Sequence, residues 1–285
     1  DVAEMTDAQR NYLQILQARA TAFKNAQPSE RKRMSTEGHI NAPILIDNQA
    51  PAVGLDPRLF DLSAPDHPNL KINRAAKNIL THFNENKLAT QVVFVERGYV
   101  DTVERSVRGA DGYPMRTPDR KPIKGTAATF NLVDALVEKL VKGGIPSGQI
   151  AIIDGRTSGK RRQEVSDAMN AGTIRVVIGM TKTLGVGVNM QKHLRALHHL
   201  DAPWMPGDLE QRNGRGQRQG NQWNTLLEYR YITDRVDGRR WQVLAIKERF
   251  IKQFLKANTE TRIIDGDSVS DEDDTDIMSS LSEAA

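Results

Sequence analysis

The sequence predicts an α/β fold in which helices cover both faces of a mainly parallel sheet. Short apolar, β-branched runs alternate with amphipathic stretches between residues 71 and 257, and this order is typical of parallel strands joined by right-handed crossovers. The 285 residues are 38% hydrophobic and 27% charged, which is enough for a buried core with polar segments to spare. At about 150 residues per domain, the length fits one large or two small domains.

The first 70 residues are predicted to be a helical extension followed by a connecting segment. Thr6 and Gln9 form a capping box, and apolar residues then recur at helical spacing as far as Phe23. Residues 28–70 are rich in Pro, Asn, Asp and Ser, a composition that favours a connection laid on the surface. Because the first residue is not Met, we expect a fragment of a longer polypeptide.

Residues 71–264 are predicted to form the main domain. Amphipathic periodicity predicts helices over 72–83, 130–141, 160–171 and 237–257. Apolar runs predict strands over 91–95, 151–154, 174–179, 195–200 and 226–232. Residues 97–129 carry a net charge of +3 and predict a long basic loop. This loop is either a nucleic-acid contact or a disordered part of the surface.

The charges divide the chain unevenly. Residues 265–285 contain eight acidic residues and no Lys or Arg, so the first 264 residues hold all 40 basic residues against 28 acidic ones, a net +12. A body of this charge suits a polyanionic partner such as nucleic acid, and it also suits a solvated surface without such a role. The acidic segment is predicted to be a disordered tail, because it has little apolar surface to bury.

Several kinds of chemistry are excluded. Without cysteine the chain has no disulfide or thiolate metal site. Residues 155–161 (GRTSGKR) have one residue too few between their glycines for a Walker A loop, and they have Arg where Ser or Thr must hold magnesium. No acidic cluster follows a strand in the manner of a Walker B site. We therefore predict no metal site, and we expect that this chain alone does not hold a nucleotide and its Mg²⁺.

Residues 181–220 carry the most informative pattern. Two glycines and Asn189 follow a predicted buried strand, where a backbone can approach a ligand closely, although a structural turn would use the same residues. Arg215 and Arg218 are expected on one face of a helix that follows the next strand. There they would form a cationic fork suited to phosphate oxygens, or else belong to a salt-bridged surface helix.

This stretch resembles the motifs of superfamily 2 helicases and translocases in the form used by the Swi/Snf-type branch. The match to motif VI consists of Gln211, Gly214, Arg215, Arg218 and Gly220. The match to motif V consists of Thr181, Lys182, Gly185, Gly187 and Asn189. Asp201, Trp204 and Pro206 resemble the segment between these motifs, and residues 91–96 resemble motif IV.

The chain is also similar to the helicase region of large phage and plasmid antirestriction proteins of the DarB type. The similarity is carried by residues 197–221 (LHHLDAPWMPGDLEQRNGRGQRQGN) and by the pieces that begin at Leu55 and Tyr229. In those proteins an adenine-specific DNA methyltransferase region is commonly joined to such a helicase. The resemblance implies the second RecA-like lobe, a three-layer α/β fold, of an ATP-dependent DNA translocase or helicase.

The resemblance also implies roles for individual residues. Arg215 and Arg218 would act as arginine fingers on ATP, and Gln211 would help to position the nucleotide. Gly187 and Asn189 would link the nucleotide cleft to the DNA track. The DNA phosphate backbone would be contacted by Thr181 and Lys182.

The expected partners and location follow from the same resemblance. ATP and Mg²⁺ would be held mainly by a first RecA-like lobe, in this chain's parent protein or in a partner chain. DNA and a DNA methyltransferase domain are the other expected partners. The expected location is the cytoplasm of a bacterial host cell or a phage virion, without membrane attachment. The alternative function is a non-catalytic DNA- or protein-binding module, for example an internal virion protein, that keeps the helicase-lobe fold.

The remaining candidates are expected to be structural. His198 and His199 lie in a predicted strand and point to opposite faces, so they cannot bind one metal together. Trp204, Trp223 and Trp241 are expected to pack against the sheet and the last helix, with base stacking as the alternative.

Overall fold

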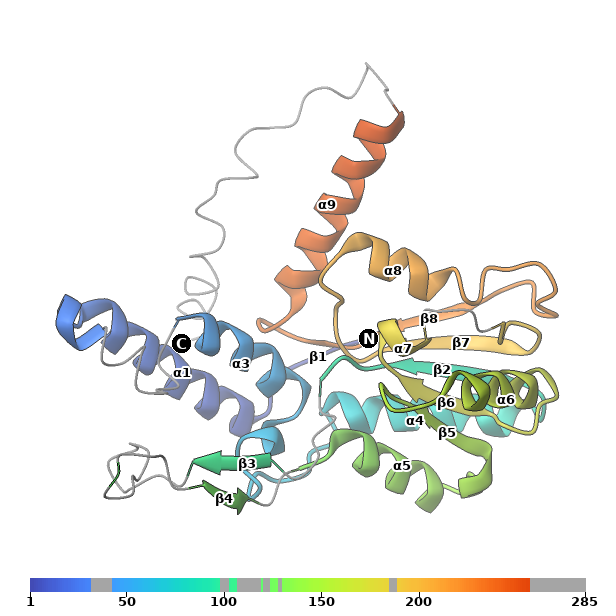
Figure 1. Cartoon of the computed structure of the whole chain (residues 1–285), viewed down its shortest axis with the longest axis horizontal. Coiled ribbons are helices and arrows are strands. Elements are labelled where there is room, and N and C mark those ends of the chain that lie inside the picture. Colours follow the sequence, from blue (N-terminus) through green and yellow to red (C-terminus); the bar gives the residue numbers. More distant parts are fainter. Residues whose placement is uncertain are drawn as a thin grey trace.

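A computed structural model describes residues 1–31, 43–97, 103–106, 119, 124–127, 130–184 and 189–256 of the chain. It contains a five-stranded sheet with helices on both faces and two helices beside it (Figure 1). The sheet consists of β5 (Ile150–Ile153), β6 (Val176–Gly179), β2 (Thr90–Phe94), β7 (Leu194–His199) and β8 (Leu227–Arg230), in this order. All its neighbouring strands run parallel, so the predicted fold class is confirmed.

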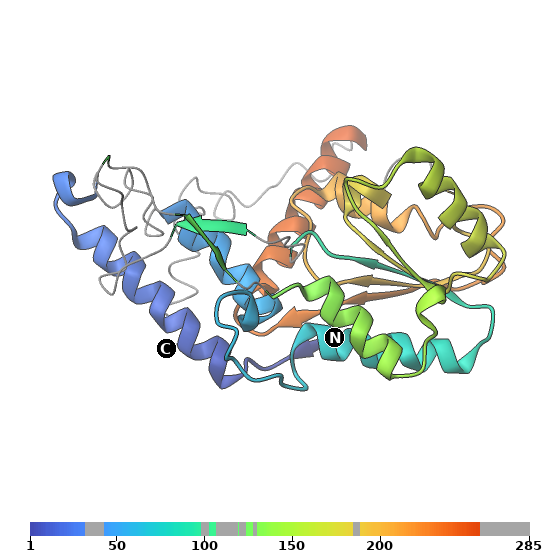
Figure 2. The ribbon, with the colours of Figure 1, turned by 60° about the horizontal axis from the view of Figure 1, so that its bottom comes forward.

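The central strand explains the layering. Every residue of β2 is buried, as expected for a strand with helices on both sides. On one face, α4 (Lys71–Glu85) and α5 (Leu132–Lys142) cover a core that includes Val93 and Ile178. On the other face, α6 (Gly159–Asn170) covers a core that includes Val92 and Phe94. Figure 2 shows α4 and α5 below the sheet and α6 above it.

The N-terminal extension consists of α1 (Asp7–Asn25), α3 (Pro43–Leu55) and the short η1 (Pro57–Leu59). The capping box of Thr6 and Gln9 is confirmed at the start of α1. The expectation of a mere connecting segment over residues 28–70 was wrong, because α3 lies within it. This helix contains Pro51, which normally signals a break, yet Ala50 and Val53 are buried against α1. Tertiary packing therefore stabilises a helix that its local sequence disfavours.

Two further parts frame the sheet. The predicted strand over 226–232 divides into β8 and β9 (Ile232–Thr233), and β9 pairs with β1 (Val2–Ala3) at the start of the chain. The last described helix, α9 (Gly238–Lys256), packs on α8 (Pro206–Asn213) through apolar side chains. No described helix is long and apolar enough to cross a membrane.

The basic segment 97–129 contains some regular structure. β3 (Val103–Ser106) and β4 (Lys124–Ala127) form an antiparallel pair, so this segment is not a loop throughout. Most of the residues between these strands, and all of the acidic tail, lie outside the described residues.

Candidate functional site

Polar side chains gather where three neighbouring strands end. Because β6, β2 and β7 are adjacent and parallel, their carboxyl ends meet at one edge of the sheet, the usual place of a ligand site in such folds. Glu96 follows β2, Asp201 follows β7, and Thr181 begins the single-turn helix α7 (Thr181–Leu184) after β6. We call these three residues, together with Arg212 of α8, the carboxyl-edge cluster.

Arg212 is the centre of this cluster, and its side chain is completely buried. Its Nε donates to the Thr181 hydroxyl at 2.7 Å, its Nη1 to the Asp201 carbonyl at 2.9 Å, and its Nη2 to Glu96 Oε1 at 2.8 Å. The guanidinium carbon also lies 5.1 Å from the centre of the Phe94 ring. Burial of a charge at this depth is tolerated because each nitrogen has an acceptor.

The cluster also determines how Thr181 and Lys182 are presented. Thr181 is only 4% exposed, and both its backbone N–H and its hydroxyl donate to Glu96. Lys182, the next residue, is exposed at the surface. Of this pair, the lysine is therefore the one whose side chain is accessible to a ligand, and the contact of both residues with DNA stays a prediction.

Arg215 and Arg218 do not lie on a helix, which corrects the sequence expectation. α8 ends at Asn213, and two glycines in quick succession, Gly214 and Gly216, disfavour its continuation. A Cβ atom at Gly216 would lie 2.4 Å from the Leu226 side chain, so glycine allows the turn to approach this residue closely. The two arginines are thus carried by the turns that follow α8.

The structure joins two of the predicted site residues. Arg218 Nη1 donates to Asn189 Oδ1 at 2.5 Å, and both residues are exposed. Arg215 is 7% exposed, and burial, followed by the nearby charge of Arg218, lowers its pKa. Asn189 is neutral, so its amide does not cancel the charge of Arg218. Two neighbouring positive charges of this kind attract an anion such as a phosphate.

Two other residues, Gln211 and Gly187, were predicted to contribute to nucleotide binding. Gln211 is exposed on the last turn of α8. Gly187 lies outside the described residues. In the part of the chain that the structure describes, no group of acidic or histidine side chains could hold a metal ion.

The two strand histidines are structural. His198 is fully buried between Tyr231 and Gln91, which it contacts at 2.8 and 2.9 Å, and burial lowers its pKa to about 3. Burial likewise lowers the pKa of His199, which stacks on Phe94. Both imidazoles are therefore neutral at physiological pH.

The three tryptophans differ in their surroundings. Trp241 packs in the α8–α9 contact, as expected, and Trp223 Nε1 donates to the His193 carbonyl at 3.0 Å. Trp204 is 63% exposed, and the guanidinium of Arg240, a residue of α9, lies 4.0 Å from its ring centre. The predicted contact with the last helix is therefore present, whereas Trp204 remains largely exposed.

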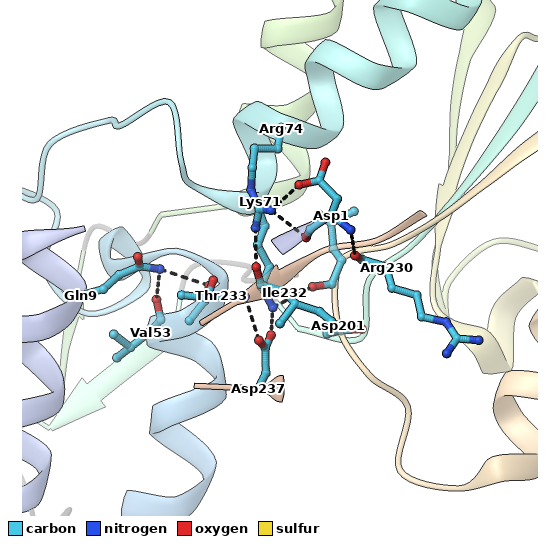
Figure 3. A network of polar contacts seen from close by, with 12 residues as sticks. Asp1, Gln9, Val53, Lys71, Arg74, Asp201, Arg230, Ile232, Thr233 and Asp237 are labelled. Atoms are coloured by element: carbon cyan, nitrogen blue, oxygen red, sulfur yellow. Dashed lines mark hydrogen bonds and ion pairs between the residues drawn. The ribbon is translucent and has the colours of Figure 1, made fainter. Parts of the chain in front are cut away.

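A second polar network connects the extension to the main domain (Figure 3). Lys71 is buried in an ion pair with Asp237 and donates to the Leu200 carbonyl at 3.2 Å. Asp237 Oδ1 accepts from the Thr233 N–H at 2.8 Å, and the Thr233 hydroxyl donates to the Gly54 carbonyl at 2.8 Å. Gly54 at the end of α3 is thus linked to the start of α4 through buried polar groups.

This network extends at both ends. Gln9 of α1 donates to the carbonyls of Val53 and Gly54 at 3.1 Å. Leu200 is directly followed by Asp201, which belongs to the carboxyl-edge cluster. Burial lowers the pKa of Lys71 and raises that of Asp201. The helical extension and the candidate site are therefore parts of one continuously bonded structure.

Sequence reasoning missed the residues that organise both networks. Arg212 stands three residues before Arg215, in the same spacing as Arg215 and Arg218, and this triplet was a usable signal. Glu96 directly follows the apolar run of β2, which is another signal for the carboxyl edge of a sheet. Lys71 and Asp237 gave no such signal, because they are 166 residues apart and are joined only by the fold.

Comparisons with known proteins agree with this architecture. Residues 126–220 match the family model of the helicase conserved C-terminal domain. The C-terminal part of the Fun30 ATPase domain aligns over 100% of this chain and 97% of that one, with a TM-score of 0.62 and 14% identity. The SWI2/SNF2 ATPase core of Sulfolobus solfataricus, solved with double-stranded DNA, aligns over 90% of this chain and 45% of that one, with a TM-score of 0.54 and 14% identity.

A curated relative extends the comparison to phage proteins. Defense against restriction protein B of Escherichia phage P1 is 32% identical over 83 residues, which are 29% of this chain and 4% of that protein. The chain thus corresponds to a small part of this relative. Residues 126–220 are thus similar to the helicase conserved C-terminal domain, and the chain has the RecA-like fold of the C-terminal lobes of these ATPase structures.

Proposed function

We propose that this chain is the second motor lobe of an ATP-dependent DNA translocase or helicase, and that it contributes two arginine fingers and part of the DNA track. The observation that carries the proposal is the bond between Arg218 and Asn189. It brings together the two segments in which nucleotide and DNA contacts are expected. The helicase-domain match over residues 126–220 supports the same assignment.

In this function, Arg215 and Arg218 neutralise phosphate charge that develops during hydrolysis. ATP bound between the two lobes would supply the phosphoanhydride bond whose cleavage drives movement, and Mg²⁺ would be held mainly by the first lobe. Gln211 orients the nucleotide from the end of α8. Gly187 and Asn189 connect this cleft to the DNA track.

Double-stranded DNA is the proposed substrate track. The solved SWI2/SNF2 core contains duplex DNA, and the first 264 residues of this chain carry a net charge of +12. Lys182 offers an exposed ammonium group beside the buried Thr181, and the basic residues of 97–129 add to the same polyanion affinity.

We further propose that the parent is a phage or plasmid antirestriction protein with a DNA methyltransferase domain. The likeness to Defense against restriction protein B supports this context. It would act in the cytoplasm of the bacterial host, to which a virion could deliver it.

The test compares the 285-residue chain alone with the same chain joined to a first lobe that carries a Walker A loop. Alone, the chain should bind duplex DNA with a Kd of roughly 10⁻⁴ to 10⁻⁶ M at physiological salt and should hydrolyse ATP no faster than a buffer blank. Assembly with the first lobe should produce DNA-stimulated hydrolysis. Turnover by the chain alone would contradict the proposal, whereas DNA binding without turnover after assembly would favour a non-catalytic module.

A further inference from the structure

Arg212 bonds to segments that the sequence separates widely. Its three nitrogen groups contact Glu96 after β2, Thr181 after β6 and Asp201 after β7. We infer that Arg212 is a positioning residue. It fixes the Thr181–Lys182 turn for contact with DNA, and it fixes the last turn of α8, from which the chain continues to Arg215. This inference rests on the proposed function and names a further residue required for it.

Arg212 and Glu96 together fix the position of Thr181. The hydroxyl of Thr181 is held from two sides, since it donates to Glu96 and accepts from Arg212 Nε at 2.7 Å. α7 has only four residues, so its own backbone bonds contribute little to its orientation. Contacts from the cluster therefore determine where Lys182 points.

Arg212 also fixes the last turn of α8. Arg212 is the penultimate residue of this helix, and its side chain ties the last turn to the sheet edge. Arg215 follows three residues later. Displacement of the last turn would therefore move Arg215 relative to Asn189 and Thr181.

The shape of the guanidinium group suits this position. Its planar fork reaches three acceptors in three directions, whereas a lysine ammonium at the same depth is a point charge on a flexible stem. The Glu96 backbone N–H also donates to Asp201 Oδ2 at 2.8 Å, so two of the acceptors are already fixed to each other. The three acceptors are therefore arranged to match the planar shape of a guanidinium group.

The test uses the full 285-residue chain with Arg212→Lys and Arg212→Met. The matched control is Arg195→Met, which removes one positive charge at the opposite, amino-terminal end of β7, where Arg195 lies 5.3 Å from the centre of the Trp223 ring. Duplex affinity is measured at a temperature at which every variant is folded. Amide hydrogen exchange of residues 181–184 is measured on the same samples.

We expect Arg212→Met to weaken duplex binding on the order of tenfold more than Arg195→Met and to accelerate exchange in residues 181–184. Arg212→Lys should keep the charge and still show faster exchange. Equal affinity and equal exchange in Arg212→Met and Arg195→Met would overturn the inference. If the wild-type chain does not bind DNA but the exchange pattern responds as expected, the proposed function fails while the positioning of the turn stands.

A double variant separates positioning from charge compensation. Glu96→Gln combined with Arg212→Met removes both charges, and the Gln carbonyl can still accept from Thr181. This variant also serves if Arg212→Met alone does not fold. Affinity restored to the Arg195→Met level would show that Arg212 merely balances Glu96, and this result would reject the positioning role. Persistent weak binding would support it.

Discussion

Individual arginines in this molecule have opposite surroundings although they are close in sequence. Arg212 is surrounded by protein acceptors, whereas Arg218 is exposed and contacts the neutral side chain of Asn189. A buried, fully bonded arginine stabilises structure, and an exposed one whose charge is not cancelled remains available to an anion. Position in the fold, more than residue type, therefore determines which of these arginines is accessible to an anion.

The first prediction concerns Arg218. In the motor assembled with its first lobe, Arg218→Ala should lower DNA-stimulated ATP turnover on the order of 10³-fold, because a phosphate-neutralising charge is lost. Nucleotide binding, measured by equilibrium titration, should change little. Arg161→Ala on the exposed face of α6 is the control, and a loss below about tenfold in Arg218→Ala would remove this residue from the finger role.

A second prediction concerns the buried pair of Lys71 and Asp237. Lys71→Met leaves the Asp237 carboxylate buried without its partner and should lower the free energy of unfolding by about 3–5 kcal/mol, measured by urea denaturation. Lys77→Met, at an exposed position of the same helix, should change it little. The double variant Lys71→Met/Asp237→Asn should recover part of the loss, and no recovery would argue against charge pairing as the cause.

At the scale of the elements, the sequence predicted those that repeat a simple pattern. Apolar residues of α4 at helical spacing and the apolar residues 92–94 of β2 indicated both their type and their burial. α3 was missed because Pro51 and Gly54 suggest a break, whereas α1 supplies an apolar surface that favours the helix. The end of α8 was missed although Gly214 and Gly216 disfavour a helix locally, and the close approach of Gly216 to Leu226 adds a tertiary contact at the same place. Local patterns cannot contain such information.

The third prediction concerns the neutral histidines of β7. The pKa of His198 is about 3 in the folded protein and near 6.5 in the unfolded chain, so the unfolded chain binds the proton more tightly. Stability from this group is therefore complete above pH 6.5 and falls by about 1.4 kcal/mol per pH unit between 6.5 and 3.

Urea denaturation between pH 6 and pH 4.5 measures this dependence. His198→Gln keeps hydrogen-bonding capacity but does not titrate. In this variant the free energy of unfolding should fall less steeply with decreasing pH, by the slope that corresponds to about one bound proton. His67→Gln at an exposed position is the control. An unchanged slope in His198→Gln would mean that this imidazole is not kept neutral by burial.

At the scale of the whole molecule, the fold brings together polar residues that lie far apart in the sequence. The carboxyl-edge cluster, the Arg218–Asn189 contact and the network through Lys71 involve residues from Gln9 in the first helix to Asp237, which directly precedes α9. The division into residues 1–70, 71–264 and 265–285 stays a prediction. Of its boundaries, the one at residue 265 separates a basic segment of the sequence from an acidic one.

That boundary leads to the fourth prediction. Residues 265–285 carry eight negative charges, and they are covalently attached to a body with a net charge of +12. Because these carboxylates compete with DNA phosphates for the same cations, deletion from Asp265 onward should strengthen duplex binding, with a larger gain at low salt than at physiological salt. Titration of both chains against one duplex at two salt concentrations measures the effect.

A chain of full length with the eight acidic residues changed to Asn or Gln distinguishes charge from length. If competition is electrostatic, this variant should bind as tightly as the truncated chain, because the body alone then meets the DNA. If the neutral tail still weakens binding, its bulk rather than its charge obstructs the surface. Equal affinities of all three chains at both salts would mean that the tail does not compete with DNA, and its charge would then act only on solubility.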